Sequence, residues 1–172
     1  MKIELLNKQE IEEQVFWISI SIGEYLRSKN YNKIPIFTCI LNGGFFFYAD
    51  LIKNLNFELK CDFLRASSYI GTQNKEVKIT KYPELSIKGE VIFLVDDILD
   101  SGNTMNFLIK EYRRREALDV IPVTLIKRES SPIIDNLICG KTIGSEWLSG
   151  YGMDNSSGTD RNRNYIYYIK NS

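Results

Sequence analysis

The feature that most constrains the fold of this chain is an apolar run followed by a polar turn and then a helical pattern, which occurs more than once. Residues 35–41 and 91–95 read as buried strands, and helical patterns follow them at 45–55 and 105–115. A third apolar run lies at 120–126. Strands that alternate with helices in this way build a largely parallel sheet flanked by helices. The sequence therefore predicts an α/β fold, with all 172 residues in a single domain.

Patterns outside these units complete the prediction. Asn7 with Glu10 three residues later resembles a helix-capping pair, and we expect a helix from there to about Lys29. Partial alternation of apolar and polar residues at 57–66 predicts a further strand. Pro122 interrupts the third apolar run, which indicates an edge strand or an irregular one, because proline cannot donate to a central ladder.

Two segments lack long regular patterns. Residues 67–82 are polar, with few apolar side chains and a central Gly71. A loop of this length is uncommon in a compact domain unless it has a function, so we expect a mobile lid there. From residue 130 onward the sequence predicts short strands and turns without a long helix.

Composition excludes several classes of protein. Apolar residues make up 44% of the chain and charged residues 26%, which is typical of a globular domain. Lys and Arg together number 22, as do Asp and Glu, so there is no broad basic field for nucleic acid or for an anionic membrane. The early acidic residues do not fit a signal peptide, and no apolar run is long enough for a bilayer span. The three cysteines are far apart in the sequence, which favours a reducing compartment, and we expect a cytoplasmic protein.

The chain contains no histidine. This removes the usual general base, the nucleophiles that histidine activates, and the commonest metal ligand. Acid–base chemistry would therefore fall to Asp, Glu, Lys, Tyr or Cys, and a bound metal would take oxygen ligands.

The second apolar run ends in a concentration of charged and hydrogen-bonding residues, in the stretch VIFLVDDILDSGNT (91–104). These residues are Asp96, Asp97 and Asp100, followed by Ser101, Gly102, Asn103 and Thr104. Ligands of parallel α/β sheets bind at this edge, where the free amides and the dipole of the next helix favour an anion. The turn is therefore suited to a phosphate, and the carboxylates to vicinal hydroxyls or to Mg²⁺. Together they predict a site for a phosphorylated ribose; the alternative is that the aspartates only cap the next helix.

The same stretch resembles the phosphoribosyl-pyrophosphate motif of the type I phosphoribosyltransferases. Four further stretches resemble segments of that family, in the family's order. ILNGGFFFYADL (40–51) is similar to its pyrophosphate loop, and SSYIGTQNKEVKI (67–79) to its mobile catalytic loop. LIKRES (125–130) is similar to the strand end with the purine-binding lysine, and EWLSGYGMDNSSGTDRNRNYIYYI (146–169) to the C-terminal segment over the purine. The branch resembled is that of the hypoxanthine(-guanine) phosphoribosyltransferases in their short bacterial form.

The resemblance implies a fold and a reaction. In the fold, a small hood formed by the terminal segments accompanies the parallel sheet. In the reaction, the 5-phosphoribosyl group passes from phosphoribosyl pyrophosphate to hypoxanthine or guanine, with Mg²⁺ as cofactor, giving IMP or GMP and pyrophosphate. The resemblance also implies a homo-oligomer, a dimer or a tetramer. From the balanced charge we expect neither nucleic acid nor a membrane as partner.

Roles for the residues around the phosphate turn follow from the resemblance. Asp96 and Asp97 would face the ribose hydroxyls, directly or through Mg²⁺. Residues 100–104 would hold the 5′-phosphate by backbone amides and hydroxyls. Asp100 would also act as general base near N7 of the purine, which agrees with the lack of histidine.

The resemblance assigns further residues to pyrophosphate. The implied contacts are Asn42, Gly43, Gly44 and Arg161. The family often has a lysine where this chain has Asn42, within a non-proline cis peptide. The loop before Arg161 is one residue longer than is usual, so Arg163 is an alternative to it. Ser68 and Tyr69 would close over pyrophosphate as part of the lid and exclude water.

The purine contacts are implied in the same way. They are Lys127, Trp147, Leu148 and Asp154. Lys127 would donate to O6 of the purine and reject adenine, which presents a donor at that position. Trp147 would stack on the base, Leu148 would read its edge through backbone groups, and Asp154 would contact a second Mg²⁺. Arg128, beside the lysine, is expected to be a surface charge.

Alternatives remain at this stage. Lys127 and Trp147 favour an oxopurine over adenine or orotate, but xanthine stays open because discrimination at C2 depends on backbone groups. A different class of protein is a nucleotide-binding regulator of RNA or transcription on the same fold. Such a regulator needs a basic surface or an added DNA-binding segment, and the balanced charge does not supply the former.

Overall fold

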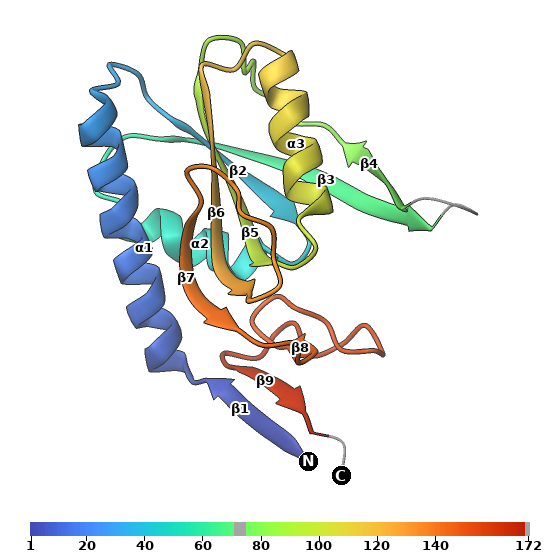
Figure 1. Cartoon of the computed structure of the whole chain (residues 1–172). Coiled ribbons are helices and arrows are strands. Elements are labelled where there is room, and N and C mark those ends of the chain that lie inside the picture. The colour runs from blue at the N-terminus through green and yellow to red at the C-terminus, as the bar shows by residue number, and fades with distance from the viewer. Residues whose placement is uncertain (71–74, 171–172) are drawn as a thin grey trace.

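The computed structural model describes residues 1–70 and 75–170 of the chain (Figure 1). Its elements in chain order are β1 (Lys2–Leu6), α1 (Lys8–Lys29), β2 (Ile36–Leu41), α2 (Phe45–Asn54), β3 (Lys60–Ile70), β4 (Lys75–Lys81), β5 (Val91–Leu99), α3 (Asn103–Arg114), β6 (Asp119–Arg128), β7 (Ile138–Ile143), β8 (Leu148–Ser149) and β9 (Ile166–Ile169). These elements form two sheets with helices around the larger one.

The larger sheet has six strands in the order β4-β3-β2-β5-β6-β7. Neighbouring strands from β3 to β7 in this order are parallel, and β4 alone pairs in the antiparallel sense, with β3. The first two helices lie on one face of the sheet and α3 on the other (Figure 1). The predicted α/β fold with a largely parallel sheet is confirmed.

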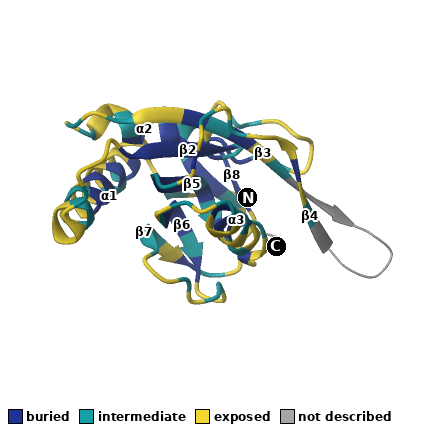
Figure 2. Cartoon of the chain, turned by 90° about the horizontal axis from the view of Figure 1, so that it is seen from above, coloured by how far each residue is buried: buried dark blue, intermediate teal, exposed yellow. Residues whose placement is uncertain are grey.

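Burial on both faces of the sheet explains why its central strands are apolar without interruption. Side chains of a strand alternate between the faces, so Phe93 of β5 packs in the core that contains α1 and α2, whereas Leu94 packs in the core that contains α3. The Phe93 ring stacks on Phe37 of β2 with the ring centroids 4.6 Å apart. In Figure 2 the buried residues gather in these central strands, and exposed residues lie on the outer side of α1 and in the loops.

The smaller sheet is antiparallel and joins the two ends of the chain, in the order β1-β9-β8. We call it the hood. It lies beyond the C-terminal ends of β6 and β7 (Figure 1). The hood was expected from the resemblance, but the sequence did not predict β1 as a strand, and β1 has only one buried residue, Leu6.

The structure confirms the predicted start of α1 but not the predicted loop over 67–82. Asn7 and Glu10 form the predicted capping box of α1, with each side chain accepting from the backbone of the other. The prediction of a loop over 67–82 is wrong for the described part of that segment, which continues β3 and forms β4. Residues 71–74 lie outside the described residues.

Of the two alternatives predicted at Pro122, the edge strand is wrong, because β6 lies between β5 and β7. Pro122 is opposite Leu94 of β5, and pairing with β7 begins only at the next residue, Val123. The side of β6 that faces β7 is therefore unpaired at Pro122, which accommodates the missing amide. In the described ranges of the chain, no helix combines the length and the apolar character that a membrane crossing requires.

Candidate active site

A cavity of about 300 Å³ lies where the C-terminal end of β5 faces the segment around β8. Its lining includes seven of the predicted site residues: Gly43, Asp97, Asp100, Trp147, Leu148, Asp154 and Arg161. The other lining residues are Ile98, Arg128 and Met153. These residues come from four separate stretches of the sequence, and the fold brings them together at the edge where α/β sheets bind ligands.

The strand β5 carries the paired carboxylates. It continues past the predicted end at residue 95 to Leu99, so Asp96 and Asp97 are part of the strand. Asp97 is buried and its Oδ1 accepts a hydrogen bond from the Ile98 amide at 2.8 Å, while Asp96 Oδ1 accepts from the Asp97 amide at 3.0 Å. Burial raises the pKa of both carboxyl groups, and the charge of Asp97 raises the pKa of Asp96 further. A cation placed here would oppose both effects.

Gly43 packs directly against Asp97. A Cβ atom at Gly43 would lie 2.2 Å from Asp97 Oδ2, so a side chain there would displace the carboxylate. The preceding peptide, Leu41–Asn42, is cis. The close approach of Gly43 to Asp97 places the turn after β2 beside the end of β5, as the predicted pyrophosphate and ribose contacts require.

The turn after β5 leaves the start of α3 open. Gly102 is the N-cap residue, with φ at +74°, and in the described chain no side chain caps this helix. Asp100 is therefore not the helix cap, which was the alternative interpretation of this residue. The first amides of α3, at Asn103 and Thr104, have no partner within the helix and can donate to an anion.

Arg128 is buried at the end of β6, so the prediction that it is a surface charge is wrong. Its Nε donates to Asp100 Oδ1 at 2.7 Å. Its Nη1 donates to the carbonyl oxygens of Gly144 and Glu146 at 3.0 and 2.9 Å. The guanidinium thus connects the phosphate turn to the segment that leads into Trp147.

Asp154 and Arg161 form an ion pair across the cavity wall, with Arg161 Nη2 2.6 Å from Asp154 Oδ2. Arg161 Nη1 also donates to the carbonyl oxygen of Gly152 at 2.6 Å. Arg163 instead pairs with Asp160, which also binds Lys2. Of the two arginines considered for pyrophosphate, Arg161 lines the cavity.

Trp147 and Leu148 are adjacent but differ in exposure. The Trp147 side chain is 69% exposed and lines the cavity, so one side of its indole is available to a planar ligand. Leu148 is buried and is part of β8, where it pairs with Tyr168 of β9. The hood therefore fixes the backbone of the residue that follows the exposed indole.

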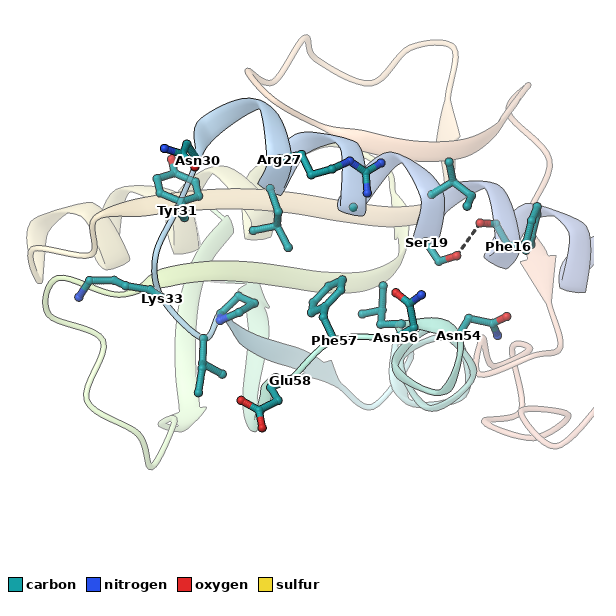
Figure 3. A pocket seen from close by; sticks show the side chains of 16 residues that line it. Phe16, Ser19, Arg27, Asn30, Tyr31, Lys33, Asn54, Asn56, Phe57 and Glu58 are labelled. Atoms are coloured by element: carbon teal, nitrogen blue, oxygen red, sulfur yellow. Dashed lines mark hydrogen bonds between the residues drawn. The ribbon is translucent and has the colours of Figure 1, made fainter.

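Size alone does not identify the site. A cavity of about 730 Å³ lies between α1 and the segment that follows α2, and includes Arg27, Asn56 and Phe57 (Figure 3). None of its lining residues, all in the described part of the chain, is a predicted site residue. The smaller cavity is the one that gathers carboxylates and an exposed indole, and Asp100 in its lining directly precedes the turn into the open start of α3.

The comparison with protein families agrees with this choice. The model of the phosphoribosyl transferase domain matches residues 8–154. The chain belongs to the phosphoribosyltransferase family. The resemblance predicted from the sequence is confirmed.

Relatives and solved structures of this phosphoribosyltransferase carry related names. A Bacillus subtilis (strain 168) protein named hypoxanthine-guanine phosphoribosyltransferase is 32% identical over 170 residues, which cover 96% of this chain and 92% of the relative. A Tritrichomonas foetus protein named hypoxanthine-guanine-xanthine phosphoribosyltransferase is 30% identical over 154 residues, covering 87% and 82% of the two chains. The crystal structure of a hypoxanthine-guanine phosphoribosyltransferase from Bacillus anthracis matches with a TM-score of 0.87 and 27% identity, and covers 98% of both chains.

Some predicted residues of the phosphoribosyltransferase do not line the cavity. They are Asn42, Gly44, Asp96, Ser101, Gly102, Asn103, Thr104 and Lys127. All except Lys127 adjoin residues of the cavity wall or of the open helix start. Lys127 lines a second cavity of about 400 Å³, with Ser131, Pro132 and Thr142. The side chains of Ser68 and Tyr69 lie outside the described part of the structure.

The carboxylates of the phosphoribosyltransferase fit a magnesium ion that is held partly by substrate. Within residues 1–70 and 75–170, no three His, Cys, Asp or Glu side chains gather as a metal cluster. Mg²⁺ often takes only one or two carboxylates and fills its shell with water and substrate phosphates. The pair Asp96 and Asp97 matches that need, because burial next to another carboxylate favours a bound cation. Asp154, also expected at a metal, is paired with Arg161.

Three cavity residues were not predicted as site residues. Ile98 and Met153 stand next to predicted residues in the sequence, and only packing shows that their side chains enter the cavity. Arg128 was expected to be a surface charge, and the predicted strand ended at residue 126, before Lys127 and Arg128. With β6 extended to residue 128, the alternation of the strand places Arg128 and Lys127 on opposite faces.

Proposed function

We propose that this phosphoribosyltransferase transfers the 5-phosphoribosyl group from phosphoribosyl pyrophosphate to hypoxanthine or guanine, releasing pyrophosphate and forming IMP or GMP. The observation that carries the proposal is the cavity itself. It places a buried aspartate, an exposed indole and an arginine–aspartate pair within one space of about 300 Å³, beside an uncapped helix start. These features correspond to the ribose, base, pyrophosphate and 5′-phosphate of the two substrates.

In this proposal the 5′-phosphate binds to the turn 100–104. The amides of Asn103 and Thr104 donate to its oxygens, and the Ser101 and Thr104 hydroxyls add further donors. Asp96 and Asp97 bind the ribose hydroxyls, directly or through Mg²⁺. When bound, Mg²⁺ would neutralise charge on the pyrophosphate group that leaves.

The reaction replaces one bond at the anomeric carbon by another. N9 of the purine forms a bond to this carbon as the carbon–oxygen bond to pyrophosphate breaks, and the bonding electrons leave with the pyrophosphate oxygen. Asp100 accepts the proton that the purine loses near N7. The nearby carboxylates stabilise the positive charge that develops on the ribose ring.

Pyrophosphate and purine occupy opposite ends of the site. We assign pyrophosphate to the backbone of Asn42, Gly43 and Gly44 and to Arg161, which must exchange its contact with Asp154 for one with substrate. The purine stacks on Trp147, meets the backbone of Leu148, and approaches Asp154. Lys127 remains the proposed donor to O6, and reaching it requires its side chain to turn from the second cavity.

Three further assignments belong to the proposal. The segment 67–82 acts as a lid, with Ser68 and Tyr69 over pyrophosphate. The chain works as a dimer or tetramer, for which Phe16, Trp17 and Ile20 on the outer face of α1 offer an exposed apolar surface. Its place is the cytoplasm, which agrees with the three free cysteines.

Xanthine is a second candidate base. The Tritrichomonas foetus relative carries xanthine in its name and is 30% identical over 154 residues of the alignment. Selection at C2 of the purine would depend on the backbone near Leu148, which xanthine can approach as well as guanine and hypoxanthine. Hypoxanthine and guanine stay the leading assignment because the Bacillus subtilis relative is named for them and aligns over 96% of this chain.

The variant Asp100→Asn tests the proposal. Removing a general base should lower kcat for IMP formation by roughly 10²–10⁴-fold. The affinity for phosphoribosyl pyrophosphate should change much less, because the base acts in the transition state. Asp135→Asn, at an exposed residue that does not line the cavity, is the matched control and should keep wild-type turnover. Wild-type protein that forms no nucleotide would refute the function, and equal losses in kcat and affinity would reduce Asp100 to a binding residue.

A further inference from the structure

We propose that Arg128 is a positioning residue, which holds the Asp100 carboxylate and the turn before Trp147 in the arrangement needed for transfer to the purine. This inference rests on the proposed function of the cavity. It concerns a residue that the resemblance did not assign and that the sequence led us to expect at the surface.

The contacts of Arg128 join two elements of the site. The Nε–Asp100 Oδ1 distance is 2.7 Å, and Nη1 donates to the carbonyl oxygens of Gly144 and Glu146. The Arg128 side chain is 10% exposed, whereas that of Asp100 is 63% exposed. A buried guanidinium is costly unless its donors are paired. Its position is therefore fixed by the protein, and the more exposed Asp100 is ordered by contact with it.

The backbone around Arg128 is tied to Asp100 as well. The Arg128 amide donates to Ser131 Oγ at 3.0 Å. The Ser131 hydroxyl donates in turn to the carbonyl oxygen of Leu99 at 2.6 Å, next to Asp100. On the other side, Arg128 pairs with Ile143 of β7, just before the turn that contains Gly144. The backbone of Arg128 is thus held from both sides, at a fixed place between the two elements that its guanidinium joins.

Two effects should follow from its loss. Asp100 would rotate freely, so fewer enzyme–substrate complexes would have the base in reach of the purine proton, and kcat would fall. The carbonyl oxygens of Gly144 and Glu146 would lose a shared donor, so Trp147 would be less well placed and the KM for the purine would rise. A lysine can keep the charge beside Asp100, but it lacks the planar fork that reaches two carbonyls as well.

The test compares Arg128→Gln and Arg128→Lys with wild type, using steady-state kinetics with phosphoribosyl pyrophosphate, Mg²⁺ and hypoxanthine. We expect Arg128→Gln to lower kcat by roughly 30-fold and to raise the purine KM by roughly 5-fold. Arg128→Lys should recover kcat to within about 3-fold of wild type while the purine KM stays raised. The control is Arg114→Gln, which removes an exposed ion pair with Glu111 on α3 and should change neither constant.

A double-variant cycle separates positioning of Asp100 from a general structural role. If Arg128 affects kcat through Asp100, Arg128→Gln should change kcat by less than about 3-fold in an Asp100→Asn background. Losses that multiply in the double variant would overturn the inference, and so would a purine KM of Arg128→Lys equal to that of wild type. If Arg128→Gln does not fold, the kinetics of Arg128→Lys test the inference: it predicts a raised purine KM with kcat near that of wild type. A wild-type protein without turnover would instead refute the proposed function, which distinguishes the two failures.

Discussion

The hydrogen bond between Tyr151 and Asp50 gives a quantitative test of how the segment that follows β8 is held at the cavity. The Tyr151 hydroxyl donates to Asp50 Oδ2 of α2 at 2.7 Å, and its ring is buried in the core. Tyr151 lies between Leu148 and Asp154, both of which line the cavity. Burial and the contact with Asp50 both raise the pKa of the phenol, so Tyr151 remains a donor at all physiological pH values.

Tyr151→Phe removes this donor and little else. A hydrogen bond to a charged group contributes about 1.5–3 kcal/mol. The Asp50 side chain is 43% exposed and keeps Lys53 at 2.7 Å, so water and the lysine compensate in part. We therefore expect a loss near the lower limit, about 1.5 kcal/mol, which corresponds to a fall in Tm of roughly 3–6 °C for a chain of this size. Since the cavity wall is loosened, the purine KM should rise by roughly 3–10-fold with kcat retained.

The matched control is Tyr25→Phe. Tyr25 also donates to a carboxylate, Asp119 Oδ2 at 2.8 Å, and neither residue lines the cavity. We expect a comparable fall in Tm, measured by calorimetry, without a change in the purine KM. An equal rise in KM in both variants would show that general destabilisation causes it. An unchanged Tm and KM in Tyr151→Phe would refute the idea that this hydrogen bond holds the segment in place.

Two further predictions concern the phosphate turn and the purine. Gly102→Ala should lower stability, because a left-handed conformation costs a residue with a side chain roughly 1–2 kcal/mol and the new Cβ would lie 2.4 Å from Pro132 Cγ. The expected fall in Tm is roughly 2–8 °C. A Tm within about 1 °C of wild type would contradict this prediction. Lys127→Met should raise the purine KM and weaken rejection of adenine, measured as the ratio of kcat/KM for hypoxanthine and adenine; an unchanged ratio would remove Lys127 from the purine site.

The elements predicted well from the sequence are those whose pattern is set by local chemistry. The Asn7–Glu10 capping box begins α1 as expected, and the apolar runs of β2 and β5 follow from burial on both faces of the sheet. The turn 100–104 was predicted to open onto a phosphate, and the structure has an uncapped helix start there. In each case the residues concerned are close together in the sequence.

The predictions that failed depend on partners far away in the sequence. β1 becomes a strand because it pairs with β9 at the other end of the chain. The described part of 67–82 is an exception, because β3 and β4 are neighbours in the sequence and pair with each other; its few apolar residues gave no alternating pattern that would have predicted these strands. Arg128 is buried because β6 extends to its position and because Asp100, Gly144 and Glu146 meet it there. No local pattern contains this information.

The measurement that tests the central claim most directly is nucleotide formation by the purified protein with phosphoribosyl pyrophosphate and Mg²⁺. Hypoxanthine, guanine, xanthine and adenine are offered separately, and the products are separated by chromatography. We expect IMP and GMP to form without AMP, and the relative rates with guanine, hypoxanthine and xanthine to rank the oxopurines. Formation of AMP at a comparable rate would contradict the assignment of the purine site, and the absence of any nucleotide would contradict the proposed function as a whole.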